Sequence, residues 1–188
     1  MNAPDRSTVT AVFALLLAAA VLTLGVRNRA LQERNRGLVQ RFTEPHAGML
    51  IPSFAAATVR GDMAVVGNPT GDTRQVVFFF TTTCSYCRAS LDKLRDLSTE
   101  LKRTPQTYGE LVMVGLDSTA AVRRYADSLQ LPMPVLMIPS QRLALLYRVR
   151  AVPQLMVLDS AGRAVFTRAG PLLTQASLDS VLASILFT

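Results

Sequence analysis

The sequence predicts an α/β domain with a mixed β-sheet, preceded by one transmembrane helix. Near the amino terminus, residues 9–26 form an apolar run without a charge. Between residues 75 and 149, strand-like and helix-like patterns alternate, as they do in sheets with parallel strands. A hairpin pattern and a last helix pattern then follow. We therefore expect the sheet to be parallel in its first half and antiparallel at its end.

The apolar run 9–26 is just long enough to cross a bilayer. As a helix with a rise of about 1.5 Å per residue it reaches about 27 Å, close to the thickness of the hydrocarbon core. A cleaved signal peptide is the alternative, although its apolar region is usually shorter. We expect an uncleaved anchor, with residues 1–8 as a tail, 27–48 as a charged tether and 49–188 as the folded domain.

Part of the formal net charge of +7 lies just after the apolar run. Five arginines are close together there: Arg27, Arg29, Arg34, Arg36 and Arg41. Because such a cluster can meet anionic lipid headgroups, we expect no nucleic-acid partner. Taken alone, the positive-inside rule places these arginines, and the domain that follows them, in the cytoplasm.

The domain opens with a predicted hairpin, because a Gly-Asp turn separates residues 52–60 from residues 63–66. Residues 75–80 are almost continuously apolar, which is typical of a buried central strand. Residues 88–101 predict a helix, since their leucines recur at spacings of three and four positions. These leucines form one apolar face: Leu91, Leu94, Leu97 and Leu101.

The pattern also predicts the rest of the domain. Asp117 or Ser118 can cap a helix, since both side chains accept backbone hydrogen bonds at a helix start. In chain order, the remaining elements are a strand at 111–116, a helix that ends at 129, an extended piece at 135–138, a helix at 141–149, a hairpin of 155–158 and 164–167, and a helix at 177–187.

Cys84 and Cys87 are the only cysteines of the chain, and they lie where the predicted strand 75–80 gives way to a helix. A dithiol at this position indicates redox chemistry, because residues three apart on a helix can form a disulfide with little backbone movement. At a helix start, free N–H groups and the helix dipole stabilise the thiolate of the first cysteine. We therefore expect Cys84 to be the nucleophile and Cys87 the resolving cysteine.

Other interpretations of the two cysteines stay open. A structural zinc site normally needs four Cys or His ligands, and His46 is the only histidine, so we expect no metal. Two cysteines can also be buried simply as small apolar side chains. For the redox interpretation, the dithiol is its own redox group and no further cofactor is expected.

Further segments beside the junction at 78–87 carry a resemblance to a known family. They are the Ile-Pro-Ser-Phe sequence at 51–54, the Gly-Asp turn, and residues 147–154 with their Val-Pro pair. Together they resemble the thioredoxin-like superfamily over residues 50–186, and more narrowly its membrane-anchored thiol–disulfide oxidoreductases of the TlpA/ResA type, in the redoxin group. The resemblance implies a thioredoxin-like fold in which helices flank a central mixed sheet.

The resemblance also implies which residues surround the dithiol. Pro153 should follow a cis peptide bond and pack beside the cysteines. The backbone of Val152 would then be free to pair with an extended substrate segment, as an added strand. Thr83, Ser85 and Tyr86 adjoin the first cysteine, and we expect them to contact the substrate as well.

The chain departs from the family pattern at three positions near the dithiol. Thr83 replaces a tryptophan, Ser90 stands where a glutamate is common, and Asp92 replaces a helix-kinking proline. Without that glutamate, the group that accepts a proton from Cys87 is open. Asp92 is one candidate.

The function implied is disulfide exchange with the thiols and disulfides of partner proteins, in the reducing direction, with a membrane thiol carrier as electron donor. By analogy with the family, the chain is a single-pass protein of a bacterial cytoplasmic membrane whose domain lies in the periplasm, contrary to the arginine cluster. A peroxiredoxin-like peroxidase is one alternative, because Thr81 and Cys84 match a Thr-x-x-Cys element, although Val77 stands in place of that family's proline. A thioredoxin-like binding module without catalysis is another.

Overall fold

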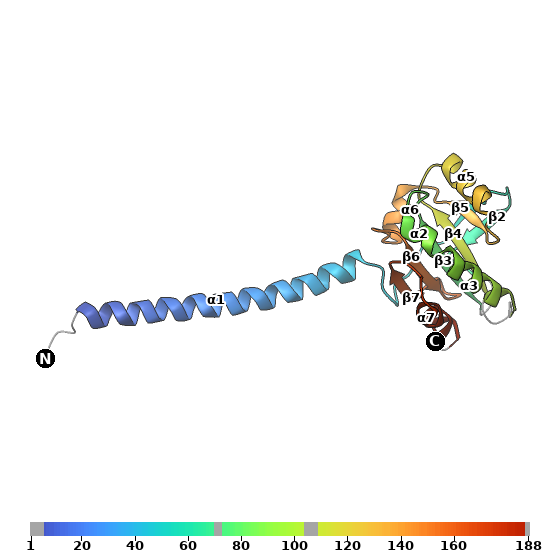
Figure 1. The fold of residues 1–188 in the computed structure, drawn as a ribbon. Helices are drawn as coiled ribbons and strands as arrows, with labels where there is room; N and C mark the ends of the chain where they lie inside the picture. Colours follow the sequence, from blue (N-terminus) through green and yellow to red (C-terminus); the bar gives the residue numbers. More distant parts are fainter. Residues whose placement is uncertain (1–5, 70–72, 104–108, 187–188) are drawn as a thin grey trace. The chain divides into compact units, whose positions relative to one another are not determined.

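A computed structural model describes residues 6–69, 73–103 and 109–186 of the chain. It contains two units, a helical one that ends at Thr43 and an α/β one that begins at Glu44. Figure 1 shows the elements of each unit.

The helical unit is one continuous helix, α1 (Arg6–Thr43). The segment Phe13–Asn35 within it is long and apolar enough to cross a membrane, with a mean hydropathy of 1.5. Its large apolar side chains, such as Leu15 and Leu22, are exposed, as the lipid-facing side chains of a single span are. The helix continues through most of the residues that we expected to form a charged tether.

A five-stranded sheet in the order β5-β4-β3-β6-β7 forms the centre of the α/β unit. The bounds of its strands are Arg74–Phe80 for β3, Gly109–Gly115 for β4, Val135–Met137 for β5, Gln154–Leu158 for β6 and Ala164–Ala169 for β7. Strands β3, β4 and β5 are parallel, whereas β6 and β7 pair antiparallel to their neighbours. The predicted mixed sheet is therefore confirmed, and β3 is its central strand.

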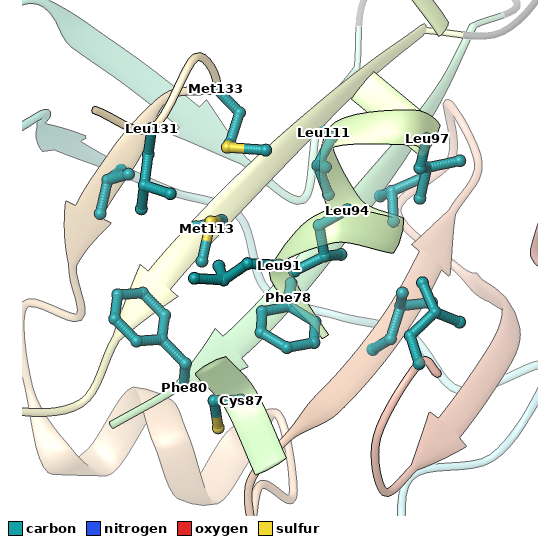
Figure 2. Packing of buried hydrophobic residues seen from close by; sticks show 14 of the residues in the cluster. Phe78, Phe80, Cys87, Leu91, Leu94, Leu97, Leu111, Met113, Leu131 and Met133 are labelled. Carbon is teal, nitrogen blue, oxygen red and sulfur yellow. The ribbon is translucent and has the colours of Figure 1, made fainter. Parts of the chain in front are cut away.

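Helices cover both faces of this sheet, and the alternation of side chains along β3 explains why (Figure 1). Phe78 and Phe80 belong to a buried cluster with residues of α3 (Leu91–Arg103), α5 (Thr119–Leu129) and α7 (Gln175–Leu186). Figure 2 shows part of this cluster, which includes Cys87. Val77 and Phe79 belong to the cluster of the other face, beneath α6 (Gln141–Leu146).

The predicted hairpin is a separate antiparallel sheet of β1 (Phe54–Ala57) and β2 (Met63–Val66). Its first strand is shorter than the predicted 52–60, and just before it the carbonyl of Pro52 accepts a hydrogen bond from the hydroxyl of Tyr147, 2.8 Å away. The aromatic ring of Tyr147 lies against both Phe54 and Phe79. This buried tyrosine therefore fastens the hairpin to the central sheet.

Two predicted helices end differently in the structure. The helix expected over 88–101 is divided at Ser90, which separates α2 (Ser85–Ala89) from α3. The helix expected over 141–149 ends at Leu146, since Arg148 adopts a left-handed conformation with φ of 55°. The last helix, expected over 177–187, spans Gln175–Leu186, and residue 187 lies outside the described residues.

Candidate active site

The dithiol lies at the carboxyl end of the central strand. Strand β3 ends at Phe80, and after a short turn Cys84 forms the N-cap of α2 with extended backbone angles. The chain passes from β3 to β4 on one side, while β6 pairs with β3 on the other. Because β6 is antiparallel to β3, the amino end of β6 lies beside the carboxyl end of β3 and the dithiol.

Cys84 and Cys87 form a disulfide with a Cα–Cα distance of 5.2 Å, within the range usual for such bonds. Cys84 is half-buried, whereas Cys87 is only 1% exposed and packs into the core cluster. A partner from solution therefore reaches Cys84 first. This asymmetry agrees with the predicted roles of nucleophile and resolving cysteine.

The sulfur of Cys84 has a hydrogen-bond donor fixed beside it. The backbone N–H of Cys87 donates to Cys84 Sγ at a distance of 3.0 Å. A thiolate accepts such a bond more strongly than a thiol or a disulfide sulfur does, because it carries the full negative charge. The helix start is therefore suited to stabilise Cys84 as the leaving and attacking group.

Val152 and Pro153 lie next to the dithiol, as expected from the resemblance. The peptide bond between them is cis, which confirms the predicted geometry, and Pro153 is buried. The carbonyl oxygen of Val152 is 3.8 Å from Cys84 Sγ. The two segments meet because Gln154, at the start of β6, pairs with Phe79 near the end of β3.

Three further residues of the predicted site face solvent around Cys84. Thr83 and Ser85 are exposed, and Tyr86 is 62% exposed. They can be reached by a partner that approaches Cys84. Their contact with a substrate stays a prediction.

Asp92, the sequence-based candidate for the proton acceptor of Cys87, lies in solvent. Its side chain is 90% exposed and forms an ion pair with Arg95 at 3.2 Å. Asp92 therefore pairs along the surface of α3 and does not reach the buried Cys87. No group of three or more His, Cys, Asp or Glu residues that could hold a metal occurs in the described part of the chain.

A positive charge and a buried phenol lie near the resolving cysteine. Tyr125 of α5 packs its ring against Phe80 with a centroid distance of 5.4 Å. Burial raises the pKa of Tyr125, and the charge of Arg88 acts in the opposite direction. Arg88 follows Cys87 in α2, and its positive charge is therefore close enough to Tyr125 to lower the pKa of that phenol against the effect of burial.

Two residues hold the dithiol segment in ways that the sequence did not indicate. Asp117 or Ser118 was expected to cap a helix. Ser118 is the N-cap of α5, although its side chain forms no capping hydrogen bond, and the carboxylate of Asp117 instead accepts a hydrogen bond from the backbone N–H of Thr82. Ser90 is fully buried, and its hydroxyl links α2 to the backbone of Leu172. Neither contact follows from local spacing, because the bonded residues are 35 and 82 positions apart.

Comparisons with known proteins agree with this geometry. A family model described as Thioredoxin-like matches residues 72–164, which include β3, the dithiol and the cis-proline. No curated protein matches the chain.

Several solved structures share the fold. A protein described as the thiol:disulfide interchange protein DsbE, from Chlorobium tepidum, is 20% identical with a TM-score of 0.64, over 76% of this chain and 99% of that one. The thioredoxin domain of a thiol-disulfide oxidoreductase from Bacteroides vulgatus is 14% identical with a TM-score of 0.61, over 74% and 98%. The peroxidoxin BcpB from Mycobacterium tuberculosis is 17% identical with a TM-score of 0.62, over 76% and 97%.

The fold prediction is thus confirmed by the strand order, by the cis-proline beside the dithiol and by the matched family model. The chain therefore contains a thioredoxin-like domain, and this domain holds Cys84 and Cys87.

Proposed function

We propose that this protein is a thiol–disulfide oxidoreductase that exchanges its Cys84–Cys87 pair with disulfides of partner proteins. The observation that carries the proposal is the asymmetry of the pair: Cys84 is accessible and accepts an N–H hydrogen bond, and Cys87 is buried directly behind it. The names of the structural neighbours from Chlorobium tepidum and Bacteroides vulgatus support the same activity.

The exchange takes place in two displacement steps. In the reduced protein, the Cys84 thiolate attacks one sulfur of a partner disulfide, so that a mixed disulfide forms and the other partner sulfur leaves as a thiolate. Cys87 then loses its proton and attacks Cys84 Sγ, which releases the second partner sulfur. The partner gains two electrons, and the protein is left with the Cys84–Cys87 disulfide.

The partner segment binds along Val152. The Val152 carbonyl lies 3.8 Å from Cys84 Sγ, so an extended segment that pairs with this backbone brings its own disulfide to the nucleophile. Pro153, Thr83, Ser85 and Tyr86 complete the contact. Such pairing recognises the backbone of the partner segment more than its side chains, which suits a protein that acts on several partners.

The protein acts as a reductant that is anchored in a bacterial cytoplasmic membrane by α1, with the domain in the periplasm. The apolar segment Phe13–Asn35 supports the anchor, and a membrane thiol carrier would return the protein to its dithiol form. The arginines that follow the uncharged run 9–26 favour the opposite orientation. The test fuses a reporter to the carboxyl terminus. Activity of a reporter that works only outside the cytoplasm would support the periplasmic location, whereas activity of a reporter that works only in the cytoplasm would overturn it.

A peroxidase is the second candidate, favoured by the Thr81-x-x-Cys84 element and by the shared fold of the peroxidoxin from Mycobacterium tuberculosis. The two candidates differ in their oxidant. The test measures how fast the reduced full-length protein reacts with hydrogen peroxide and with a peptide disulfide. A faster reaction with hydrogen peroxide would favour the peroxidase.

The deciding experiment uses matched cysteine variants of the full-length protein in detergent, with a disulfide-bridged peptide as oxidant. Cys84→Ser should abolish reduction of the peptide, because Cys87 is buried. Cys87→Ser should instead accumulate the mixed disulfide between Cys84 and the peptide, seen as a mass increase that dithiothreitol reverses. Full activity in Cys84→Ser, or no reduction by the unchanged protein, would overturn the proposal.

A further inference from the structure

Ser90 joins two parts of the active site that are far apart in the sequence. It ends α2, the helix of the dithiol, and is fully buried. Its hydroxyl donates a hydrogen bond to the carbonyl of Tyr86 at 2.8 Å and accepts one from the N–H of Leu172 at 2.9 Å. One oxygen atom therefore connects the dithiol helix to the segment between β7 and α7.

That segment is bonded in turn to the cis-proline. The N–H of Gly170 donates to the carbonyl of Pro153 at 2.9 Å. Gly170 has a φ of 91°, a conformation that glycine adopts without strain, and no heavy atom lies within 4 Å of where a Cβ would be. The backbone orientation at Gly170, not a lack of space, is thus the reason for glycine at this position.

The contacts form a closed path around the nucleophile. From Ser90 the path runs to Leu172, along the chain to Gly170, across to Pro153, and through the Val152 carbonyl back to Cys84 Sγ, 3.8 Å away. The cysteine and the backbone that receives the partner are therefore held together by two hydrogen bonds besides the pairing of β3 with β6.

We propose that Ser90 is a positioning residue that keeps Cys84 in register with the partner-binding backbone of Val152. This inference rests on the proposed exchange function. A hydroxyl can serve here because it donates and accepts at the same time. Alanine would leave the buried N–H of Leu172 without a partner, so the segment would move to find one, and the bond from Gly170 to Pro153 would move with it.

Ser177 provides a matched control. It is also buried, and its hydroxyl donates to the carbonyl of Thr174 at 2.7 Å and accepts from the N–H of Thr174 at 3.1 Å. Each hydroxyl thus donates one hydrogen bond and accepts one, but that of Ser177 bonds to Thr174, three residues before it, and not to the dithiol helix. Ser177→Ala reports what the loss of a buried hydroxyl does to stability alone, and Ser90→Thr retains the hydroxyl.

The test compares two oxidants with the reduced full-length protein in detergent. A small aromatic disulfide reacts with Cys84 without needing Val152, whereas a disulfide-bridged peptide must pair along it. Ser90→Ala should slow the peptide reaction by about tenfold or more, since small misplacements of reacting groups cost up to about 100-fold. The reaction with the small disulfide should change little, Ser177→Ala should change neither, and Ser90→Thr should restore the peptide rate.

Equal losses with both oxidants, an unchanged peptide rate in Ser90→Ala, or the same loss in Ser177→Ala would each overturn the inference. If Ser90→Ala does not fold, Gly170→Ala tests the other link of the path, because its φ disfavours a side chain, and it should show the same selective loss. If the unchanged protein reduces neither oxidant, the exchange function fails. Hydrogen exchange then still tests the path, since the amides of Gly170 and Leu172 should lose protection in Ser90→Ala and keep it in Ser177→Ala.

Discussion

Replacing Asp117 by alanine tests how firmly the segment before the dithiol is held. The carboxylate of Asp117, which follows β4, accepts a hydrogen bond from the N–H of Thr82, two residues before Cys84. A hydrogen bond to a charged group contributes about 1.5–3 kcal/mol. Asp117 is half-buried, which reduces the charge contribution, so we expect Asp117→Ala to lower the free energy of unfolding by about 1.5–2 kcal/mol.

This change should be visible by calorimetry. In a domain of about 150 residues, each kcal/mol of lost stability lowers Tm by about 2–4 °C, so we expect a fall of about 3–8 °C. The measurement uses the oxidised full-length protein in detergent, so that the disulfide is intact in every variant. The same variants, once reduced, are then assayed with the disulfide-bridged peptide, and Asp117→Ala should react more slowly because Cys84 is less well placed.

Two further variants separate the hydrogen bond from other effects. Asp117→Asn retains an oxygen acceptor without the charge, and a neutral hydrogen bond contributes about 1 kcal/mol, so about half of the lost stability should return. Asp127 is an exposed aspartate on α5, and Asp127→Ala should change stability by no more than about 0.5 kcal/mol. Equal Tm values for Asp117→Ala and Asp127→Ala would refute the reasoning, since the bond to Thr82 would then contribute nothing measurable.

Three other substitutions have clear expected outcomes. Tyr147→Phe should cost about 1 kcal/mol in urea unfolding, because the bond to the Pro52 carbonyl is lost. Burial raises the pKa of Tyr147, so the folded protein should lose stability as the pH rises above about 10, and Tyr147→Phe should remove part of that loss. Gly109→Ala should yield little folded protein by circular dichroism, since a Cβ there would lie 1.6 Å from the carbonyl oxygen of Arg74, at a φ of 92°. Gly115→Ala should be milder, a loss of about 1–3 kcal/mol by calorimetry, because the atoms nearest to its Cβ belong to the side chain of Val122 and not to the backbone.

The elements that local pattern determines could be predicted from the sequence. The apolar run of β3 and the leucine face of α3 are short-range signals, and both are present in the structure where they were expected. The dithiol is equally local, since Cys84 and Cys87 share one turn. The cis geometry of Pro153 came from a resemblance, because nothing in the spacing of a single proline distinguishes cis from trans.

The parts that could not be predicted depend on residues distant in the sequence. The four leucines all follow Ser90, and the buried Cys87 before it keeps a spacing of four to Leu91, so the division between α2 and α3 has no signal in the apolar pattern. At the division, the hydroxyl of Ser90 accepts a hydrogen bond from the N–H of Leu172, 82 positions away, and this contact has no local signal either. Likewise, the role of Tyr147, the C-cap of α6, depends on contacts of its ring with Phe79 and of its hydroxyl with Pro52, which lie on other segments.

The chemistry of the site also depends in part on neighbouring residues and in part on residues that are distant in the sequence. The residues from Cys84 to Cys87 determine which sulfur attacks and which N–H supports it, and a short motif encodes both. Where that sulfur stands relative to Val152 is determined by Asp117, Ser90 and Gly170, which belong to other elements. Substitutions inside the motif should therefore change reactions with all disulfides, whereas substitutions at the three distant residues should act mainly on disulfides that must pair along Val152. Since Ser90 differs from the glutamate common in the family, selectivity among partners cannot be transferred from relatives even when the motif is shared.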